Sequence, residues 1–284
     1  MKSKLRQYWS LIKSLQTGLL LLTGLSGYMS ARCPVYNLPL VLGVAGSLFF
    51  TIGGSTILNM WYDRDIDAKM KRTCRRPLPA GDIKPREGFI FGLILSILGV
   101  GWAVAIDGLY GAVVFAGLFF NVIVYTICLK RRTAWSIVWG GLSGGMPVMA
   151  GRVLGVGHFD WVGIVLTLAV VFWIPTHILT FNLRHYDDYR NAGIPTLPFA
   201  YGFQATRKII AVSSVIAAFA MAISAVAIGT YIGFLRVIGV LSAGLFMLAI
   251  GSLLKPSERI YFGLFKYSSL YMLSSMLLMA AQGI

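Results

Sequence analysis

Residues 59–67 read Asn59-Met60-Trp61-Tyr62-Asp63-Arg64-Asp65-Ile66-Asp67, and this polar run directly follows an apolar segment. If the helix of that segment continues, Asn59, Asp63 and Asp67 recur every four residues and lie on one face, while Asp65 points elsewhere. Oxygen ligands in a row at the end of an apolar helix suit a hard cation such as Mg²⁺. A solvated charged loop is the alternative, but such a loop does not need acids at regular spacing.

Basic residues follow the acidic run at once, and they are Lys69, Lys71, Arg72, Arg75 and Arg76. Lysine and arginine side chains bind phosphate oxygens through charge-assisted hydrogen bonds. A protein-bound Mg²⁺ commonly contacts the phosphates of a substrate as well. The segment therefore predicts a site for a metal ion together with a phosphorylated ligand.

The whole chain has the composition of an integral membrane protein. Of its 284 residues, 57% are hydrophobic and only 12% are charged, and the mean hydropathy is +0.76. Soluble domains carry roughly 25% charged residues. The net charge of +15 would suggest nucleic acid as the partner of a soluble protein, but in a membrane protein it first reflects topology. We therefore expect a lipid bilayer around the protein and no nucleic-acid partner.

Nine segments are apolar and long enough for a transmembrane helix, which needs about 20 residues. They lie near 14–31, 38–61, 87–106, 109–128, 135–154, 161–183, 209–229, 232–254 and 262–282. No soluble domain, long linker or strict repeat interrupts them. The sequence predicts an all-α integral membrane protein, a bundle of nine transmembrane helices in which residues 1–284 form a single membrane domain.

Basic residues are distributed asymmetrically between the two sides of this predicted bundle. With the N-terminus in the cytoplasm, only Arg32, Arg152 and Arg236 of the 25 lysines and arginines fall on the outer side. Of the ten acidic residues, only Asp107 and Asp160 do so. This asymmetry obeys the positive-inside rule. It predicts a cytoplasmic N-terminus, an outer C-terminus and a site that faces the cytoplasm from the cell membrane.

A second polar segment follows the 161–183 span and reads Asn182-Leu183-Arg184-His185-Tyr186-Asp187-Asp188-Tyr189-Arg190. Two acidic clusters that face each other would bind a diphosphate through bridging Mg²⁺ ions. Metal ions and cations stabilise the charge that develops on a departing diphosphate. The alternative is an interfacial turn in which Asp187 and Asp188 are simply solvated.

Two features inside the spans carry less specific signals. His177 lies within an apolar span, where polar residues commonly face the bundle interior and have a function, although a hydrogen-bonded packing histidine is equally compatible. The segment Gly140-Gly141-Leu142-Ser143-Gly144-Gly145 contains two overlapping small-xxx-small patterns. Such patterns indicate close helix packing more often than ligand contact.

The motif Asn59-xxx-Asp63-xxx-Asp67 resembles the first aspartate-rich motif of the UbiA-type intramembrane prenyltransferases. Their nine-helix bundle matches the number of predicted spans. The haem O synthase branch of that family is the most similar. The similar segments are Tyr62-Asp63-Arg64-Asp65-Ile66-Asp67-Ala68-Lys69-Met70-Lys71-Arg72-Thr73, Arg76-Pro77-Leu78-Pro79, Lys130-Arg131-Arg132-Thr133, Gly140 to Pro147, His177, Asp188-Tyr189 and Gly193-Ile194-Pro195-Thr196-Leu197-Pro198.

The resemblance implies a Mg²⁺-dependent enzyme that transfers a polyprenyl group, farnesyl or geranylgeranyl, from its diphosphate to haem B. The farnesyl group would add to a vinyl group of haem B, and water would complete the hydroxyfarnesyl product. It assigns catalytic roles to Asp63, Asp67 and Asp188. It assigns metal binding to Asn59, Asp63, Asp67, Asp187 and Asp188. It assigns substrate binding to Asn59, Lys69, Arg72, Arg76, Lys130, His177, Arg184 and Tyr189.

Two other functions remain open from the sequence. Thr196-Leu197-Pro198 is more similar to the branches that prenylate a quinone precursor or an archaeal glycerol lipid. A cation-coupled transporter would also carry carboxylates in its membrane helices. Transporters, however, place their binding residues near the midplane of the membrane, whereas the acids here lie in loops or at helix ends.

Overall fold

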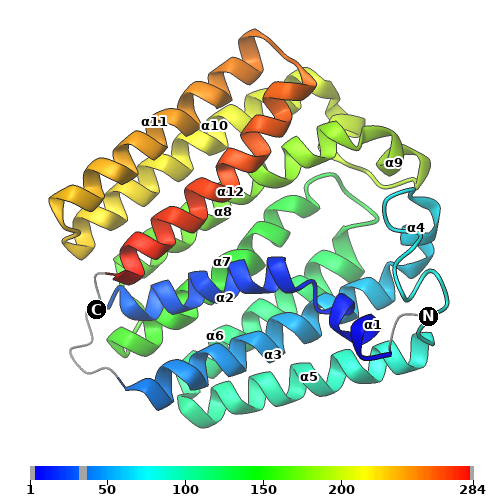
Figure 1. Cartoon of the computed structure of the whole chain (residues 1–284), viewed down its shortest axis with the longest axis horizontal. Helices are drawn as coiled ribbons and strands as arrows, with labels where there is room; N and C mark the ends of the chain where they lie inside the picture. The colour runs from blue at the N-terminus through cyan, green and yellow to red at the C-terminus, as the bar shows by residue number, and fades with distance from the viewer. Residues whose placement is uncertain (1–3, 32–36, 282–284) are drawn as a thin grey trace.

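The computed structural model describes residues 4–31 and 37–281, so that Arg32 lies outside the described residues. Within those residues the regular structure is entirely helical, with turns and loops between the helices and no β-strand. The long helices run side by side as a bundle, and the short helices α1, α4 and α9 lie together at one end of it (Figure 1). We call this end, which includes residues 62–84 and 185–196, the polar end.

Each of the nine predicted ranges contains a helix in the described part of the chain. The helices are α1 (Lys4–Leu11), α2 (Ser14–Met29), α3 (Leu38–Tyr62), α4 (Arg64–Lys69), α5 (Pro85–Ile106), α6 (Gly108–Phe119) continued by the π-helix η1 (Phe120–Leu129), α7 (Ser136–Val156), α8 (Trp161–Arg184), α9 (Tyr186–Asn191), α10 (Leu197–Ile228), α11 (Ile232–Leu254) and α12 (Glu258–Ala280). Among these, six segments are long and apolar enough to cross a membrane: α3, α5, α6 with η1, α8, α10 and α11. The other three are α2, which has only 16 residues, the glycine-rich α7, and α12, which is rich in serine and tyrosine.

The largest departure from the predicted boundaries is at the start of α10. The sequence analysis expected residues 184–208 to form a loop before a span at 209–229, but α10 already begins at Leu197. A kink at Gly202, whose φ is +81°, separates the first turns from the rest. The sequence did not indicate these early helical turns, because they contain polar residues and Pro198. A proline is nevertheless tolerated in the first turn of a helix.

Glycines allow helix α7 to approach its neighbours closely, as the small-xxx-small patterns predict. A Cβ atom on Gly144 would lie 2.4 Å from Ile174 Cδ1 on α8. On the other side of α7, a Cβ on Gly151 would lie 1.9 Å from the Gly24 carbonyl oxygen on α2. Since the second obstacle is backbone, no larger residue fits there without separating α2 from α7.

Helix α7 also lies between the two largest buried clusters. One cluster joins α8, α10, α11 and α12 with Val148 of α7. The other joins α3, α5 and α6 with Met149, Ala150 and Val153 of the same helix. Figure 1 shows the corresponding groups of helices on either side of α2 and α7. The polar end therefore joins two helix groups, each of which contributes one acidic segment.

Candidate active site

The first acidic segment forms a corner between α3 and α4. Helix α3 ends at Tyr62, and α4 begins at Arg64. The hydrogen bonds from Asp63 N to Asn59 O, 3.0 Å, and from Asp67 N to Asp63 O, 2.8 Å, keep the four-residue spacing across the corner. Asp63 and Asp67 are only 2% and 7% exposed, whereas the side chain of Asp65 is 57% exposed. The structure thus separates two buried carboxylates from one exposed carboxylate.

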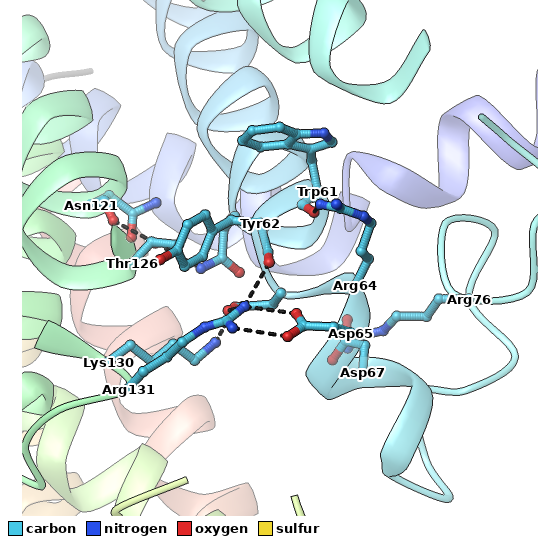
Figure 2. A network of polar contacts seen from close by, with 12 residues as sticks. Trp61, Tyr62, Arg64, Asp65, Asp67, Arg76, Asn121, Thr126, Lys130 and Arg131 are labelled. Atoms are coloured by element: carbon cyan, nitrogen blue, oxygen red, sulfur yellow. Dashed lines mark hydrogen bonds and ion pairs between the residues drawn. The ribbon is translucent and has the colours of Figure 1, made fainter. Parts of the chain in front are cut away.

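Asp63 is held by basic residues that follow η1. Lys130 Nζ donates a hydrogen bond to Asp63 Oδ2, and Arg131 Nη2 lies 3.9 Å from Asp63 Oδ1 (Figure 2). Burial by itself would lower the pKa of Lys130, but Tyr125 and Asp63 outweigh it and raise that pKa. Lys130 therefore remains an ammonium beside the carboxylate. Asp63 Oδ1 is buried and accepts no hydrogen bond within the described residues.

Asp67 is bound by the loop that follows α4. Arg76 Nη1 donates to Asp67 Oδ2 at 2.7 Å, and the Thr73 hydroxyl donates to the backbone carbonyl of Asp67 at 2.8 Å. These two bonds fold residues 70–76 back over the corner. Arg76, a predicted substrate-binding residue, therefore lies next to a predicted catalytic carboxylate.

Arg131 is not among the site residues predicted from the sequence, although its neighbour Lys130 is. Its guanidinium binds both oxygens of Asp65, at 2.9 and 2.7 Å, and donates to the Tyr62 carbonyl at 2.7 Å. The hydrogen bond from Arg131 is the main reason that the pKa of Asp65 is lowered. Figure 2 shows this fork on the open side of the corner. The π-helix explains the contact, because a widened turn changes the direction in which the following residues point.

Asn59 contacts the neighbouring helix through its amide nitrogen. Its amide nitrogen donates to the Thr126 hydroxyl at 2.8 Å, and Thr126 donates in turn to the Asn121 carbonyl at 2.7 Å. This chain connects α3 to η1 one turn below Asp63. Asn59 therefore fixes the position of η1, and with it the loop that carries Lys130.

A small apolar cluster brings the two acidic segments together. It consists of Ile66 and Met70 from the first segment, Ala192 and Ile194 from the second, and the partly buried Tyr189. Burial raises the pKa of Tyr189, while the nearby positive charges of Arg72, Lys130 and Arg76 oppose that rise. Tyr189 thus lies among basic side chains of the first segment. The prediction that the two segments face each other agrees with this packing.

The five predicted metal ligands do not form one compact cluster. Within residues 4–31 and 37–281, no group of three or more histidine, cysteine, aspartate or glutamate side chains is close enough to hold a metal ion. Asp63 and Asp67 are each bound by a basic residue, Asp188 is half-buried, and Asp187 is exposed. Lys69, a predicted substrate-binding residue, is also exposed.

His177 and Arg184 lie away from the acidic corner, on the side of α12. The His177 ring stacks between Trp173 and Phe265, with centroids 5.1 and 4.4 Å away, and its Nδ1 shares a 3.1 Å hydrogen bond with the Ser269 hydroxyl. The Arg184 guanidinium lies 4.2 Å above the ring of Phe262. These two predicted substrate-binding residues therefore belong to a separate part of the polar end.

Lys13 is a basic residue of the site that the sequence analysis counted only for topology. It joins α1 to α2 in a left-handed conformation, with φ of 49° and ψ of 61°, which is uncommon for a residue other than glycine. Burial, together with the charges of Arg76 and Lys130, lowers its pKa to about 7, while Asp67 and Asp63 oppose the change. Its only sequence signal was a lysine directly before the first predicted span.

An apolar cavity of about 670 Å³ lies between α3, α5 and the α6–η1 helix. Trp61, Tyr62 and Ile127 line it at the polar end, within one helical turn of Asp63 and Lys130. Its other lining residues are Leu58, Phe89, Leu93, Ser96, Ile97, Val100, Gly101, Phe115, Leu118, Phe119, Val122 and Ile123. The cavity is suited to an apolar chain that begins at the ionic residues.

The family model and similar known proteins indicate the same family for this chain. The model of the UbiA prenyltransferase family matches residues 20–270. Protoheme IX farnesyltransferase of Archaeoglobus fulgidus is 42% identical over 202 residues, which cover 71% of this chain and 70% of that protein. The protein of the same name from Pyrobaculum arsenaticum is 40% identical over 205 residues, covering 72% and 73% of the two chains.

Solved structures share the fold at lower sequence identity. The structure of digeranylgeranylglyceryl phosphate synthase has a TM-score of 0.80 and 21% identity, and 99% of each chain is covered. A UbiA homologue from Archaeoglobus fulgidus, solved with GPP and Mg²⁺ bound, has a TM-score of 0.70 and 19% identity, covering 96% of this chain and 99% of that one. Together with the family match over most of the sequence, the fold leads to a plain conclusion: this chain belongs to the UbiA prenyltransferase family.

Proposed function

We propose that the protein transfers a farnesyl group from farnesyl diphosphate to haem B and so forms haem O. Relatives at about 40% identity over some 70% of the chain carry the name protoheme IX farnesyltransferase. The structural observation that carries the proposal is the apolar cluster of Ile66, Met70, Ala192, Ile194 and Tyr189. That cluster joins the two acidic segments, and the positive charges of Arg72, Arg76 and Lys130 act on its member Tyr189, which suits the binding of a diphosphate there.

The residues of the acidic corner fit a Mg²⁺ ion in their chemistry. Asp63 Oδ1 is a buried carboxylate oxygen without a hydrogen-bond donor among the described residues, and Asp67 is a second buried carboxylate. Hard oxygen ligands of this kind are those that Mg²⁺ prefers, and the ion commonly completes its shell with water and substrate phosphate. We propose Asp63 and Asp67 as its main ligands, with Asp188 on the facing segment, Asp187 beside it and Asn59 behind the corner. When bound, the ion would neutralise negative charge on the diphosphate.

The basic residues would act on the same leaving group. The charges of Lys130, Arg76 and Arg72 all act on Tyr189, and these side chains would donate hydrogen bonds to the diphosphate oxygens. Lys69 extends from the end of α4 at the open side. As the allylic carbon–oxygen bond breaks, its electron pair leaves with the diphosphate, and these cations stabilise the charge that develops there.

The apolar cavity between α3, α5 and η1 would hold the isoprenoid tail. Its volume of about 670 Å³ lies within the range of ~300–1,000 Å³ that is typical of ligand sites. Apolar walls keep bulk water away from an allylic carbocation without a dedicated catalytic side chain. In the proposed reaction a vinyl group of haem B then forms the new carbon–carbon bond. One water molecule supplies the hydroxyl group and loses a proton, which completes the hydroxyfarnesyl side chain.

His177 is proposed to contact the acceptor. It lies deeper in the bundle than the acidic corner, in a stack of aromatic rings between α8 and α12. A planar aromatic acceptor would approach the reactive end of the prenyl chain from this side. Tyr189, between the two groups of residues, would border both substrates.

For the arrangement in the membrane we propose nine crossings, with the polar end in the cytoplasm of the cell and residues 1–284 as one membrane domain. The first described helix and the last turn of α12 lie at opposite ends of the bundle, as an odd number of crossings requires (Figure 1). The distribution of lysine and arginine supports the orientation. This orientation would be tested by introducing single cysteines at the two ends of the bundle and labelling them in intact cells.

The proposed reaction is tested with purified protein in detergent, Mg²⁺, farnesyl diphosphate and haem B. We expect mass spectrometry to detect hydroxyfarnesylated haem, and we expect the product to vanish without Mg²⁺ and in the Asp63→Asn variant. Release of diphosphate with a quinone precursor or glycerol lipid, but not with haem, would assign the protein to another acceptor. Absence of turnover of farnesyl and geranylgeranyl diphosphate by folded protein would contradict the proposal.

A further inference from the structure

A second group of cations lies at the polar end, between α8, α10 and α12, and differs from the acidic corner. Arg184 and Lys266 both lie 4.2 Å from the ring of Phe262, and Arg207 lies 5.7 Å from the ring of Tyr261. In the part of the chain that the structure describes, none of the three cations forms an ion pair with a carboxylate. We call Arg184, Arg207, Tyr261, Phe262 and Lys266 the cationic cluster.

Two hydrogen-bond donors within this cluster are buried and unused. Arg207 Nε and Tyr261 Oη are inaccessible to solvent and have no hydrogen-bond partner among the described residues. Tyr261 is only 7% exposed as a whole residue. Buried polar groups in proteins are nearly always paired, and an unpaired one is costly. Arg207 Nε can only donate, so its missing partner is an acceptor such as the oxygen of a ligand, and the Tyr261 hydroxyl can donate to the same kind of partner.

The cationic cluster continues into an aromatic ladder that leads to His177. On α12, Phe262, Phe265 and Ser269 follow one another at three- and four-residue spacing and therefore share a face. Phe265 contacts Phe181 at 5.7 Å and stacks on His177 at 4.4 Å. The cations therefore lie at the end of the aromatic ladder that is nearer to the polar end of the bundle.

A fourth cation lies over the same aromatic ladder. Arg72 lies 4.8 Å above the ring of Phe181. The region thus has an excess of cations, in contrast to the paired charges around Asp63 and Asp67.

We propose that the cationic cluster binds the carboxylate groups of the acceptor, namely the two propionates of haem B, through Arg184, Arg207 and Lys266. This inference rests on the proposed function. Arginine and lysine form strong, charge-assisted hydrogen bonds with carboxylates. The apolar macrocycle would extend along the aromatic ladder toward His177, with its vinyl groups directed to the prenyl chain. The phosphate of an anionic lipid offers similar oxygens, so the experiment must separate the two ligands.

The test compares haem B with its dimethyl ester, which lacks both negative charges. Protein is reconstituted into bilayers of phosphatidylcholine alone, and binding is followed by the haem absorbance. We expect wild type to bind the ester about tenfold or more weakly than haem B, because hydrogen bonds to charged groups are lost. The variant R184Q/K266Q, which keeps Arg207, should lose most of the difference in affinity between haem B and the ester, with no further loss for the ester. The neighbouring Lys208→Gln variant is the matched control and should behave as wild type.

Three outcomes would overturn the inference. Equal affinity of wild type for haem B and the ester would remove the role of the carboxylates, even if haem O is formed. An equal loss for both ligands in R184Q/K266Q would indicate a structural effect. If the variant differs from wild type only in bilayers with phosphatidylglycerol, the cations bind lipid phosphate. Absence of both haem binding and product in wild type would instead contradict the proposed function itself.

Discussion

The acidic corner and the cationic cluster lie at the same end of the bundle but balance their charges in opposite ways. At the corner, Asp63 pairs with Lys130 and Asp67 with Arg76. In the cluster, Arg184 and Lys266 contact only the ring of Phe262 among the described charged and aromatic partners. A site whose charges are already paired stays balanced when a metal cation and a polyanion bind together. A site with unpaired cations is balanced only when an anion binds. The two regions therefore fit two different substrates.

The largest expected effect follows from removal of a buried charge at the corner. We expect Asp63→Asn to lower kcat/KM by about 10²–10³-fold with every acceptor, the size typical for loss of one group that stabilises developing charge. Asp65→Asn is the matched control in the same segment. Its carboxylate is exposed and paired with Arg131, so we expect less than a tenfold loss. Steady-state kinetics of both variants would check this, and equal losses would refute the difference between the two carboxylates.

The packing between the two acidic segments gives the next effect. Ile194 is 5% exposed and contacts the first segment through Ile66 and Met70. We expect Ile194→Ala to destabilise the protein by about 2–5 kcal/mol and to raise KM for farnesyl diphosphate. The control Ile238→Ala, in the distant core of α11, should lower the unfolding temperature to a similar extent. If Ile238→Ala also raises KM for farnesyl diphosphate, the effect of Ile194→Ala is not specific to the site.

Lys13 makes diphosphate binding depend on pH. In the free protein its pKa is about 7, so Lys13 is charged below pH 7 and increasingly neutral above it. A bound diphosphate favours the ammonium form and raises that pKa. We therefore expect constant affinity below pH 7 and a decrease of up to about tenfold per pH unit above it. Calorimetry in buffers with different ionisation enthalpies should detect proton uptake above pH 7.

The variant Lys13→Met separates this effect from other titrations. It should bind the diphosphate more weakly at low pH and lose the proton uptake above pH 7. If wild type and variant show the same pH profile, Lys13 does not contribute its charge to the diphosphate. The cationic cluster should show no such dependence, since it consists mainly of arginine.

The smallest expected effect concerns the ring that holds two of the unpaired cations. Phe262→Leu keeps an apolar side chain but removes both cation–π contacts, which are worth about 0.5–1 kcal/mol each at exposed sites. Because both cations remain in the variant, only about half of that energy should appear in binding, so we expect KM for haem B to rise about two- to fivefold, with KM for farnesyl diphosphate unchanged. A rise in KM for the diphosphate instead would mean that the two regions are not separate sites.

Local patterns in the sequence were sufficient to predict the long helices and the spacing of the acidic residues at the corner. Apolar runs separated by short turns gave all nine helical ranges in the described residues, and the four-residue spacing of Asn59, Asp63 and Asp67 is present across the α3–α4 junction. Close packing of α7 followed from its glycines, because a small residue allows the backbones of two helices to touch.

Contacts between distant segments were not predictable in the same way. The basic run at 130–132 did not reveal that Arg131 pairs with Asp65, because that contact depends on the widened turn of η1. Lys13 joins the site through a left-handed junction between α1 and α2. The resemblance predicted Arg184 as a substrate-binding residue without saying where it lies, and tertiary packing directs it to Phe262 on α12.

The most direct test of the account is a double-mutant cycle on Asp63 and Asp188, measured as Mg²⁺-dependent binding of a non-hydrolysable farnesyl thiodiphosphate. If both acidic segments hold one metal–diphosphate complex, each single Asp→Asn variant should lose most of the binding. The double variant should then be little worse than either single variant, because residues that share one ligand are not additive. Wild-type affinity in Asp188→Asn, or losses that simply multiply in the double variant, would contradict a shared site.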